Sequence, residues 1–166
     1  MAVGKTAVGR NLARTLRRRF VDLDKIIEKS EGMKIKDIFG RKGESYFRQA
    51  EKRALAKVLF QNEQVIATGG GAVMDEENLL LLRKKSFLVC LTANPEMLLV
   101  RAGDTRQRPL LADGDRLQRI QELLARRERN YAQAHVSIDT SDLNVNQVTG
   151  KIMEALKRRG LVSCKP

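Results

Sequence analysis

The sequence predicts a single doubly wound α/β domain, in which helices cover both faces of a parallel sheet. Segments with the period of a strand alternate along the chain with segments of helical period. The stretch from Ser86 to Thr92 is a near-continuous apolar run without a polar face, which is typical of a strand covered on both sides. The length of 166 residues fits one domain over residues 1–166.

The elements follow in order. Strands are predicted over residues 20–24, 64–68, 86–92 and 135–139. Helices are predicted over residues 5–19, 25–31, 34–41, 44–60, 115–131 and 144–159, with two more after Asp75 and from Pro95. Gly32 suits a helix end, Asp75 an N-cap and Pro95 a first turn. Residues 103–114 have no clear period, and we interpret them as a mobile lid loop.

Composition limits the partners and the compartment. The net charge of +12 favours anionic ligands, although most of these charges are expected on solvated helix faces. Nucleic acid is disfavoured because there is no Trp and the aromatic residues are not interleaved with the basic ones. No apolar run is long enough to span a membrane, and the start does not resemble a secretory signal. Cys90 and Cys164 look unpaired, which favours a reducing cytoplasm. We also expect a monomer.

The first candidate site is the start of the chain. Gly4-Lys5-Thr6 looks like the end of a phosphate-binding loop, in which backbone N–H groups and Lys hold phosphates and Thr ligates Mg²⁺. The helix that follows would add its positive end. The first Gly of a full loop is absent, so a plain helix N-terminus is the alternative.

The segment FVDLD carries the second candidate pair. On a strand, Asp22 and Asp24 would face the same side, so that one could hold Mg²⁺ through water while the other accepts a hydroxyl proton. The alternative is that Asp24 merely caps the next helix.

Two arginines lie on otherwise apolar helix stripes. Arg48 shares a face with Leu55 and Leu59, and Arg127 shares one with Ile120 and Leu124. Such an arginine needs an anionic partner, which can be a ligand carboxylate bound in a bidentate manner. For Arg48 the neighbouring Glu51 is the alternative partner.

Glycines and further arginines complete the set. Three glycines directly after a strand, residues 69–71, suggest a close approach of backbone to a ring-shaped substrate, with a tight turn as the alternative. Arg101, Arg106 and Arg108 lie on and before the loop, where they could close over a triphosphate; a flexible basic loop is the alternative.

Taken together, these residues resemble the shikimate kinase family. The motifs are GKTAVGRNLA, FVDLD, GESYFRQAE, VIATGGGAV, RPLL and RRERNY, in this order along nearly the whole chain. The resemblance implies a P-loop fold of the nucleoside-monophosphate-kinase type. It also implies transfer of the γ-phosphoryl of ATP to the 3-hydroxyl of shikimate, with Mg²⁺, on the route to chorismate and aromatic amino acids.

The resemblance implies a role for each candidate. Asp24 would be the base, with Lys5 and Arg108 as the other catalytic residues. Shikimate would be bound by Asp24, Arg48, Gly69, Gly70, Gly71 and Arg127. ATP would be bound by Gly4, Lys5, Thr6, Ala7, Arg101 and Arg108, and Mg²⁺ by Thr6 and Asp22.

The chain departs from the family pattern at its start. Met1-Ala2-Val3 stands where the family has the last part of its phosphate loop, and the first, central strand is absent. We expect weak ATP binding, slow turnover and exposed sheet edges as a result. The alternatives to shikimate kinase are another small-molecule kinase of this fold, such as a gluconate kinase, and a degenerate kinase that acts as a basic binding module.

Overall fold

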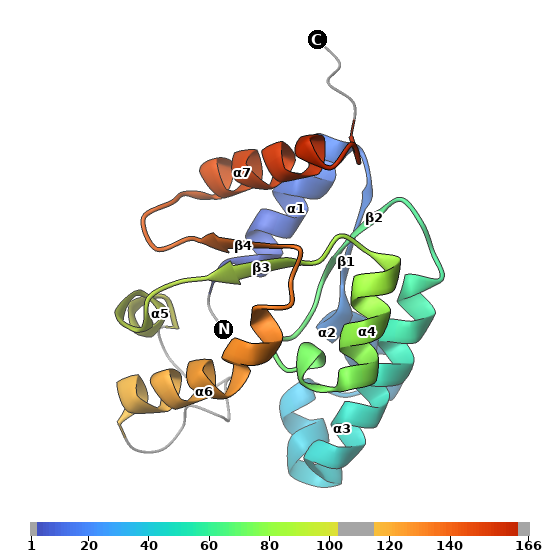
Figure 1. Cartoon of the computed structure of the whole chain (residues 1–166). Helices are drawn as coiled ribbons and strands as arrows, with labels where there is room; N and C mark the ends of the chain where they lie inside the picture. The colour runs from blue at the N-terminus through green and yellow to red at the C-terminus, as the bar shows by residue number, and fades with distance from the viewer. Residues whose placement is uncertain (1–2, 103–114, 163–166) are drawn as a thin grey trace.

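The computed structural model describes residues 3–102 and 115–162 (Figure 1). The strands are β1 (Arg19–Asp22), β2 (Gln64–Ala67), β3 (Val89–Thr92) and β4 (Val136–Asp139). The helices are α1 (Lys5–Leu16), α2 (Leu23–Glu31), α3 (Ile35–Leu59), the short 3-10 helix η1 (Ala72–Met74), α4 (Glu76–Lys85), α5 (Pro95–Ala102), α6 (Arg116–Tyr131) and α7 (Val145–Arg158).

The strands form two parallel pairs. Val21 of β1 is in register with Ile66 of β2, and Leu91 of β3 is in register with Ile138 of β4. The parallel α/β fold class is therefore confirmed. In the described part of the chain, however, β1–β2 and β3–β4 are separate two-stranded sheets.

Helices pack on both faces of the strands. On one face, α1 and α7 bury Val8, Leu12, Val148 and Ile152 in the cluster that also contains Ile138. On the other face, α2, α3 and α4 surround β1 and β2 with the largest apolar cluster. Figure 1 shows α5 and α6 side by side. They contribute Leu98 and Ile120 to a separate, smaller cluster that also contains Val3.

Most element boundaries lie close to the predicted ones. Gly32 closes α2 with a φ of 67°, Asp75 caps α4 through Asn78 N–H, and Asp115 caps α6. Gly43 breaks α3 with φ 80° and ψ 170°, where the sequence predicts two helices. No helix in the described ranges combines the length and apolar character needed to cross a bilayer. The predicted lid, residues 103–114, lies outside the described residues.

Two strand predictions are too long. The strand predicted over 20–24 ends at Asp22, because Leu23 and Ile27, four residues apart and both fully buried, begin the helical period of α2. The strand predicted from Ser86 begins at Val89. Just before it, Leu88 forms two hydrogen bonds with His135, each 2.9 Å long. The backbone N–H of His135 donates to Leu88 O, and the backbone N–H of Leu88 donates to His135 Nδ1. This contact gives His135 a structural role at the start of the β3–β4 pair.

Candidate active site

The start of α1 lies beside the end of β1. Gly4 precedes the helix with a φ of 82°, a left-handed conformation that favours glycine. Thr6 Oγ1 lies 3.3 Å from Asp22 Oδ2, so the two predicted metal ligands are neighbours. Ala7 is exposed on the first turn. A hydroxyl and a carboxylate oxygen next to a helix N-terminus form a suitable place for a phosphate-bound divalent cation.

Asp24 lies in the first turn of α2, not on a strand as predicted, so strand alternation with Asp22 does not place it. Burial raises the pKa of Asp24 above its usual 3.8, and the negative charge of Asp22 raises it further, while Lys5 partly offsets the rise. A carboxylate with a raised pKa is a better proton acceptor near neutral pH. The helix N-cap is Asp22, so the alternative role of Asp24 as the cap is wrong.

Arg48 is held by two glutamates of its own helix. Its Nη1 donates to Glu51 Oε2 at 2.7 Å, and its Nε and Nη2 donate to Glu44 Oε1 at 3.2 and 2.9 Å. Glu51 is 1% exposed, and its Oε1 has no hydrogen-bond partner in the structure. Burial raises the pKa of Glu51, and Arg48 opposes this rise. Glu51 is thus the partner that the sequence suggests for Arg48, but one fork of the guanidinium faces the exposed Glu44.

Arg127 is buried, as its place on an apolar stripe predicts, whereas Arg126 and Arg129 are exposed. Two hydrogen bonds fasten the end of α6 around it, one to the glycine segment and one to η1. Tyr131 Oη donates to Gly70 O at 3.1 Å, and Asn130 Nδ2 donates to Val73 O at 2.7 Å.

Each of the three glycines faces a different part of this polar set. A Cβ built on Gly69 would lie 3.1 Å from Glu51 Oε1 and 3.4 Å from Asp24 Oδ1. On Gly70 it would lie 2.8 Å from Tyr131 Oη and 3.0 Å from Arg127 Nη1, and on Gly71 it would lie 2.5 Å from Arg48 Nη1. None of the three has a positive φ. Close approach, rather than turn conformation, therefore accounts for this run of glycines.

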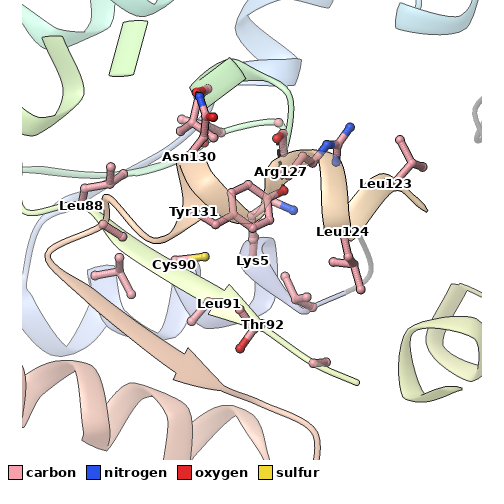
Figure 2. A pocket seen from close by; sticks show the side chains of 18 of the residues that line it. Lys5, Leu88, Cys90, Leu91, Thr92, Leu123, Leu124, Arg127, Asn130 and Tyr131 are labelled. Atoms are coloured by element: carbon pink, nitrogen blue, oxygen red, sulfur yellow. Dashed lines mark hydrogen bonds between the residues drawn. The ribbon is translucent and has the colours of Figure 1, made fainter. Parts of the chain in front are cut away.

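A cavity of about 80 Å³ opens between this segment, α6 and β3 (Figure 2). Lys5 and Arg127 line it together with Gly70, and Cys90 and Leu91 of β3 form part of its apolar wall. The structure therefore brings the predicted phosphate-binding lysine and one predicted carboxylate clamp to the same cavity. Asp24 and Arg48 reach the glycines from α2 and α3 without lining this cavity.

Arg101, a predicted nucleotide-binding residue, bonds elsewhere. Arg101 donates to Thr140 Oγ1 at 3.1 Å and to the carbonyl oxygens of Thr140 and Ser141 at 2.8 and 3.0 Å. It therefore fastens α5 to the turn after β4. Arg108 lies outside the described residues, as does Arg106.

Sequence reasoning missed Asn130 and Tyr131 and treated Glu51 only as a possible partner of Arg48. The positions of Asn130 and Tyr131, three and four residues after Arg127, were a usable signal, because residues at these spacings share a helix face. The described residues contain no group of three or more His, Cys, Asp or Glu suited to a metal. A cation here would need ligands beyond protein carboxylates, as Mg²⁺ on a nucleotide has.

Comparison with known proteins agrees with this geometry. A family model described as shikimate kinase matches residues 1–157. The chain is 43% identical to a shikimate kinase of Caldanaerobacter subterraneus subsp. tengcongensis over 96% of this chain and 94% of that protein. It is 46% identical to one of Moorella thermoacetica over 95% and 90%. A structure of shikimate kinase from Acinetobacter baumannii in complex with shikimate superposes with a TM-score of 0.93 at 34% identity, over 98% of this chain and 91% of that one. The chain therefore belongs to the shikimate kinase family.

Proposed function

We propose that this chain transfers the γ-phosphoryl group of ATP to the 3-hydroxyl of shikimate. The observation that carries the proposal is the arrangement around residues 69–71. The carboxylates of Glu51 and Asp24 lie against Gly69, and the guanidinium groups of Arg127 and Arg48 lie against the next two glycines. Two guanidinium groups suit a carboxylate substrate, and a glycine backbone leaves room for a ring.

Binding and proton transfer are assigned to separate groups. Arg127 and Arg48 bind the carboxylate of the substrate. In the free protein, Nε and Nη2 of Arg48 donate to Glu44, and on binding they donate to the substrate carboxylate instead. That exchange is inexpensive because an exposed ion pair within a helix is worth about 0.3–0.5 kcal/mol. Glu51 keeps the other fork in place, and the side chain of Arg48 stays directed at Gly71.

Asp24 acts on the acceptor alcohol. Its carboxylate accepts the proton as the hydroxyl oxygen bonds to the γ-phosphorus and the bond to the bridging oxygen of ADP breaks. Lys5 and the N-terminus of α1 hold the phosphates, and charge stabilisation supplies most of the rate, as is usual in phosphoryl transfer. Thr6 and Asp22 would hold Mg²⁺, which would supply positive charge to offset the charge of the phosphates. Arg101 and Arg108 are assigned to the nucleotide on the family resemblance.

Other properties follow the same proposal. The protein acts as a cytoplasmic monomer, with ATP and shikimate as its ligands and neither nucleic acid nor membrane as a partner. The paired arginines favour a carboxylate substrate over a basic binding module without choosing the ring, and the family match favours shikimate over gluconate.

The test is coupled ADP release with shikimate and with gluconate, each in the presence and absence of Mg²⁺. We expect Mg²⁺-dependent turnover with shikimate alone. Turnover with gluconate instead would move the chain to another kinase class. Salt-sensitive nucleic-acid binding with no ADP release would favour a binding module.

A further inference from the structure

A groove of about 550 Å³ follows the outer side of β1. It is lined by the strand itself and by residues of α1 and α2, and no described residue of β2 contributes to it. Within the described ranges β1 pairs with β2 alone, so the groove lies along the free edge of β1. The free edge of a sheet is a template for a further strand.

This edge presents backbone groups at the spacing of a strand. In a parallel ladder, only alternate residues bond to a given neighbouring strand. Arg19 N–H donates to Glu63 O at 3.2 Å, which shows that Arg19, and with it Val21, bonds toward β2. Phe20 and Asp22 therefore direct their backbone N–H groups to the outer side, where an added strand can accept from them.

Cations from all three elements line the same groove. They are Arg10, Arg14, Arg18, Arg19 and Lys25, and the described residues around the groove include one acid, Asp22. Arg14 is exposed and has no ion pair within the described part of the chain. Arg10 is also exposed, and its guanidinium carbon lies 5.2 Å from the centre of the Phe20 ring. Such a surface attracts a negatively charged ligand.

Two of these cations already have partners. Arg18 pairs with Glu63 at 2.9 Å, and Lys25 pairs with Glu28 at 2.8 Å. The ligand is therefore assigned to the arginines of α1.

The spacing of Arg10 and Arg14 matches that of an extended peptide. They are four residues apart on α1, so they share a helix face and lie about 6 Å apart along the axis. Alternate side chains of a strand share a face at a spacing of about 6.6 Å. Helix α1 packs directly on β1, since a Cβ built on Gly9 would lie 2.7 Å from the Phe20 ring. A strand added beside β1 would thus place alternate side chains against the two arginines.

We propose that the outer edge of β1 binds an extended acidic segment of another protein, which adds a strand to the sheet and pairs alternate Asp or Glu side chains with Arg10 and Arg14. A peptide suits the edge better than a nucleic acid or an anionic membrane, because neither of these has a backbone with regularly repeated N–H and C=O groups. A second copy of this edge is repelled by its own cations. The inference goes beyond the reaction proposed above and does not depend on it.

The probe is a labelled, capped peptide of about seven residues in which glutamate alternates with threonine. One matched peptide has lysine in place of glutamate. A second keeps the glutamates but has methylated backbone nitrogens, so that its charge remains and its hydrogen-bond donors are lost. Both matched peptides are tested on the unaltered chain, so this comparison does not depend on how a variant folds.

The protein variant is Arg14→Glu. Its control is Arg41→Glu, because Arg41 is an exposed arginine of α3 that does not line the groove. Binding is measured by fluorescence anisotropy, and amide hydrogen exchange is compared between the free and the peptide-bound chain.

We expect the acidic peptide to bind with a Kd below about 1 mM, and the lysine peptide not to bind. Arg14→Glu and backbone methylation should each weaken binding about tenfold or more, and Arg41→Glu should leave it unchanged. In the complex, the amides of Phe20 and Asp22 should exchange about tenfold more slowly.

Absence of binding would overturn the proposal. Equal affinity for the methylated peptide, or unchanged exchange at Phe20 and Asp22, would overturn strand addition. Equal affinity of the Arg14→Glu protein would remove the ion pairs on which the choice of an acidic partner depends. A single-stranded oligonucleotide of the same charge that binds more tightly than the peptide, and loses affinity in Arg14→Glu, would make the groove a nucleic-acid site instead.

Discussion

Replacement of Gly71 by alanine should damage substrate binding while leaving the fold intact. The new Cβ would lie 2.5 and 2.7 Å from Nη1 and Nη2 of Arg48 and 2.8 Å from its Cζ. Since non-bonded heavy atoms pack at about 3.5 Å or more, the guanidinium must retreat by about 1 Å. That shift lengthens the 2.7 Å bond to Glu51 Oε2 beyond hydrogen-bond range. A misplacement of this size costs about 100-fold in kcat/KM for the carboxylate substrate.

Stability should change much less than activity. Gly71 has φ −91° and ψ −15°, which alanine adopts without strain, and the smaller entropy of the unfolded chain contributes about 0.4–1 kcal/mol. The loss of the Arg48 bond to buried Glu51 opposes this with about 1–3 kcal/mol. The net loss therefore lies between about 0 and 2.6 kcal/mol, or at most about 10 °C in Tm.

The assay varies shikimate at saturating ATP and ATP at saturating shikimate, with thermal unfolding alongside. Gly40→Ala is the control, because no atom lies within 4 Å of its Cβ and it is remote from the site. The effect should fall in the order Gly71, Gly70, Gly69, following nearest contacts of 2.5, 2.8 and 3.1 Å. A Gly71→Ala enzyme whose kcat/KM for shikimate stays within about threefold of the wild type would refute the close-approach reasoning.

Three further changes test the other groups. Asp24→Asn should lower kcat by about 10²–10⁴-fold with ATP affinity unchanged. Burial raises the pKa of Asp24, so protonated Asp24 stabilises the folded state fully at pH values below its usual pKa of 3.8. This contribution is lost as the pH rises through the raised pKa, and the Tm of the wild type relative to the Asp24→Asn variant should therefore fall over that pH range. A Tm difference that does not change with pH would contradict this. Arg127→Ala should raise KM for shikimate about tenfold or more, while the exposed Arg126→Ala should not; a change in ATP affinity alone would remove Arg127 from the carboxylate site. Tyr131→Phe removes the donor to Gly70 O, should cost about 0.5–1.5 kcal/mol of stability, and should raise KM for shikimate but not for ATP; equal KM values would make the contact purely structural.

The order of elements and the inward place of Arg127 were predictable because both follow from apolar spacing. The spacing of Val8, Leu12 and Leu16 predicts α1, and Ile120 and Leu124 place Arg127 on the buried face of α6. The end of β1 was missed because FVDLD satisfies strand alternation, while the competing pair Leu23 and Ile27 satisfies the helical period. Tertiary burial decides between two such patterns, and the local sequence does not show it.

Contacts between distant elements were beyond the sequence. The three glycines predicted a close approach between the backbone and another group. They did not show that side chains of α2, α3 and α6 would lie against them, because that depends on how these helices pack together. The burial of Glu51 likewise depends on the glycine segment that covers it, since Gly69 lies beside its unpartnered Oε1. From the sequence alone, Glu51 could equally be an exposed residue that forms an ordinary surface ion pair with Arg48.

The two halves of the site belong to the two strand pairs. Asp24 and Arg48 extend from helices packed on β1 and β2, whereas Arg127 lies on α6 beside β3. The hydrogen bonds that Asn130 and Tyr131 donate to Val73 O and Gly70 O join the two halves. These two bonds therefore help to fix the position of Arg127 relative to Arg48 before substrate arrives, and they reduce the ordering that substrate binding has to impose.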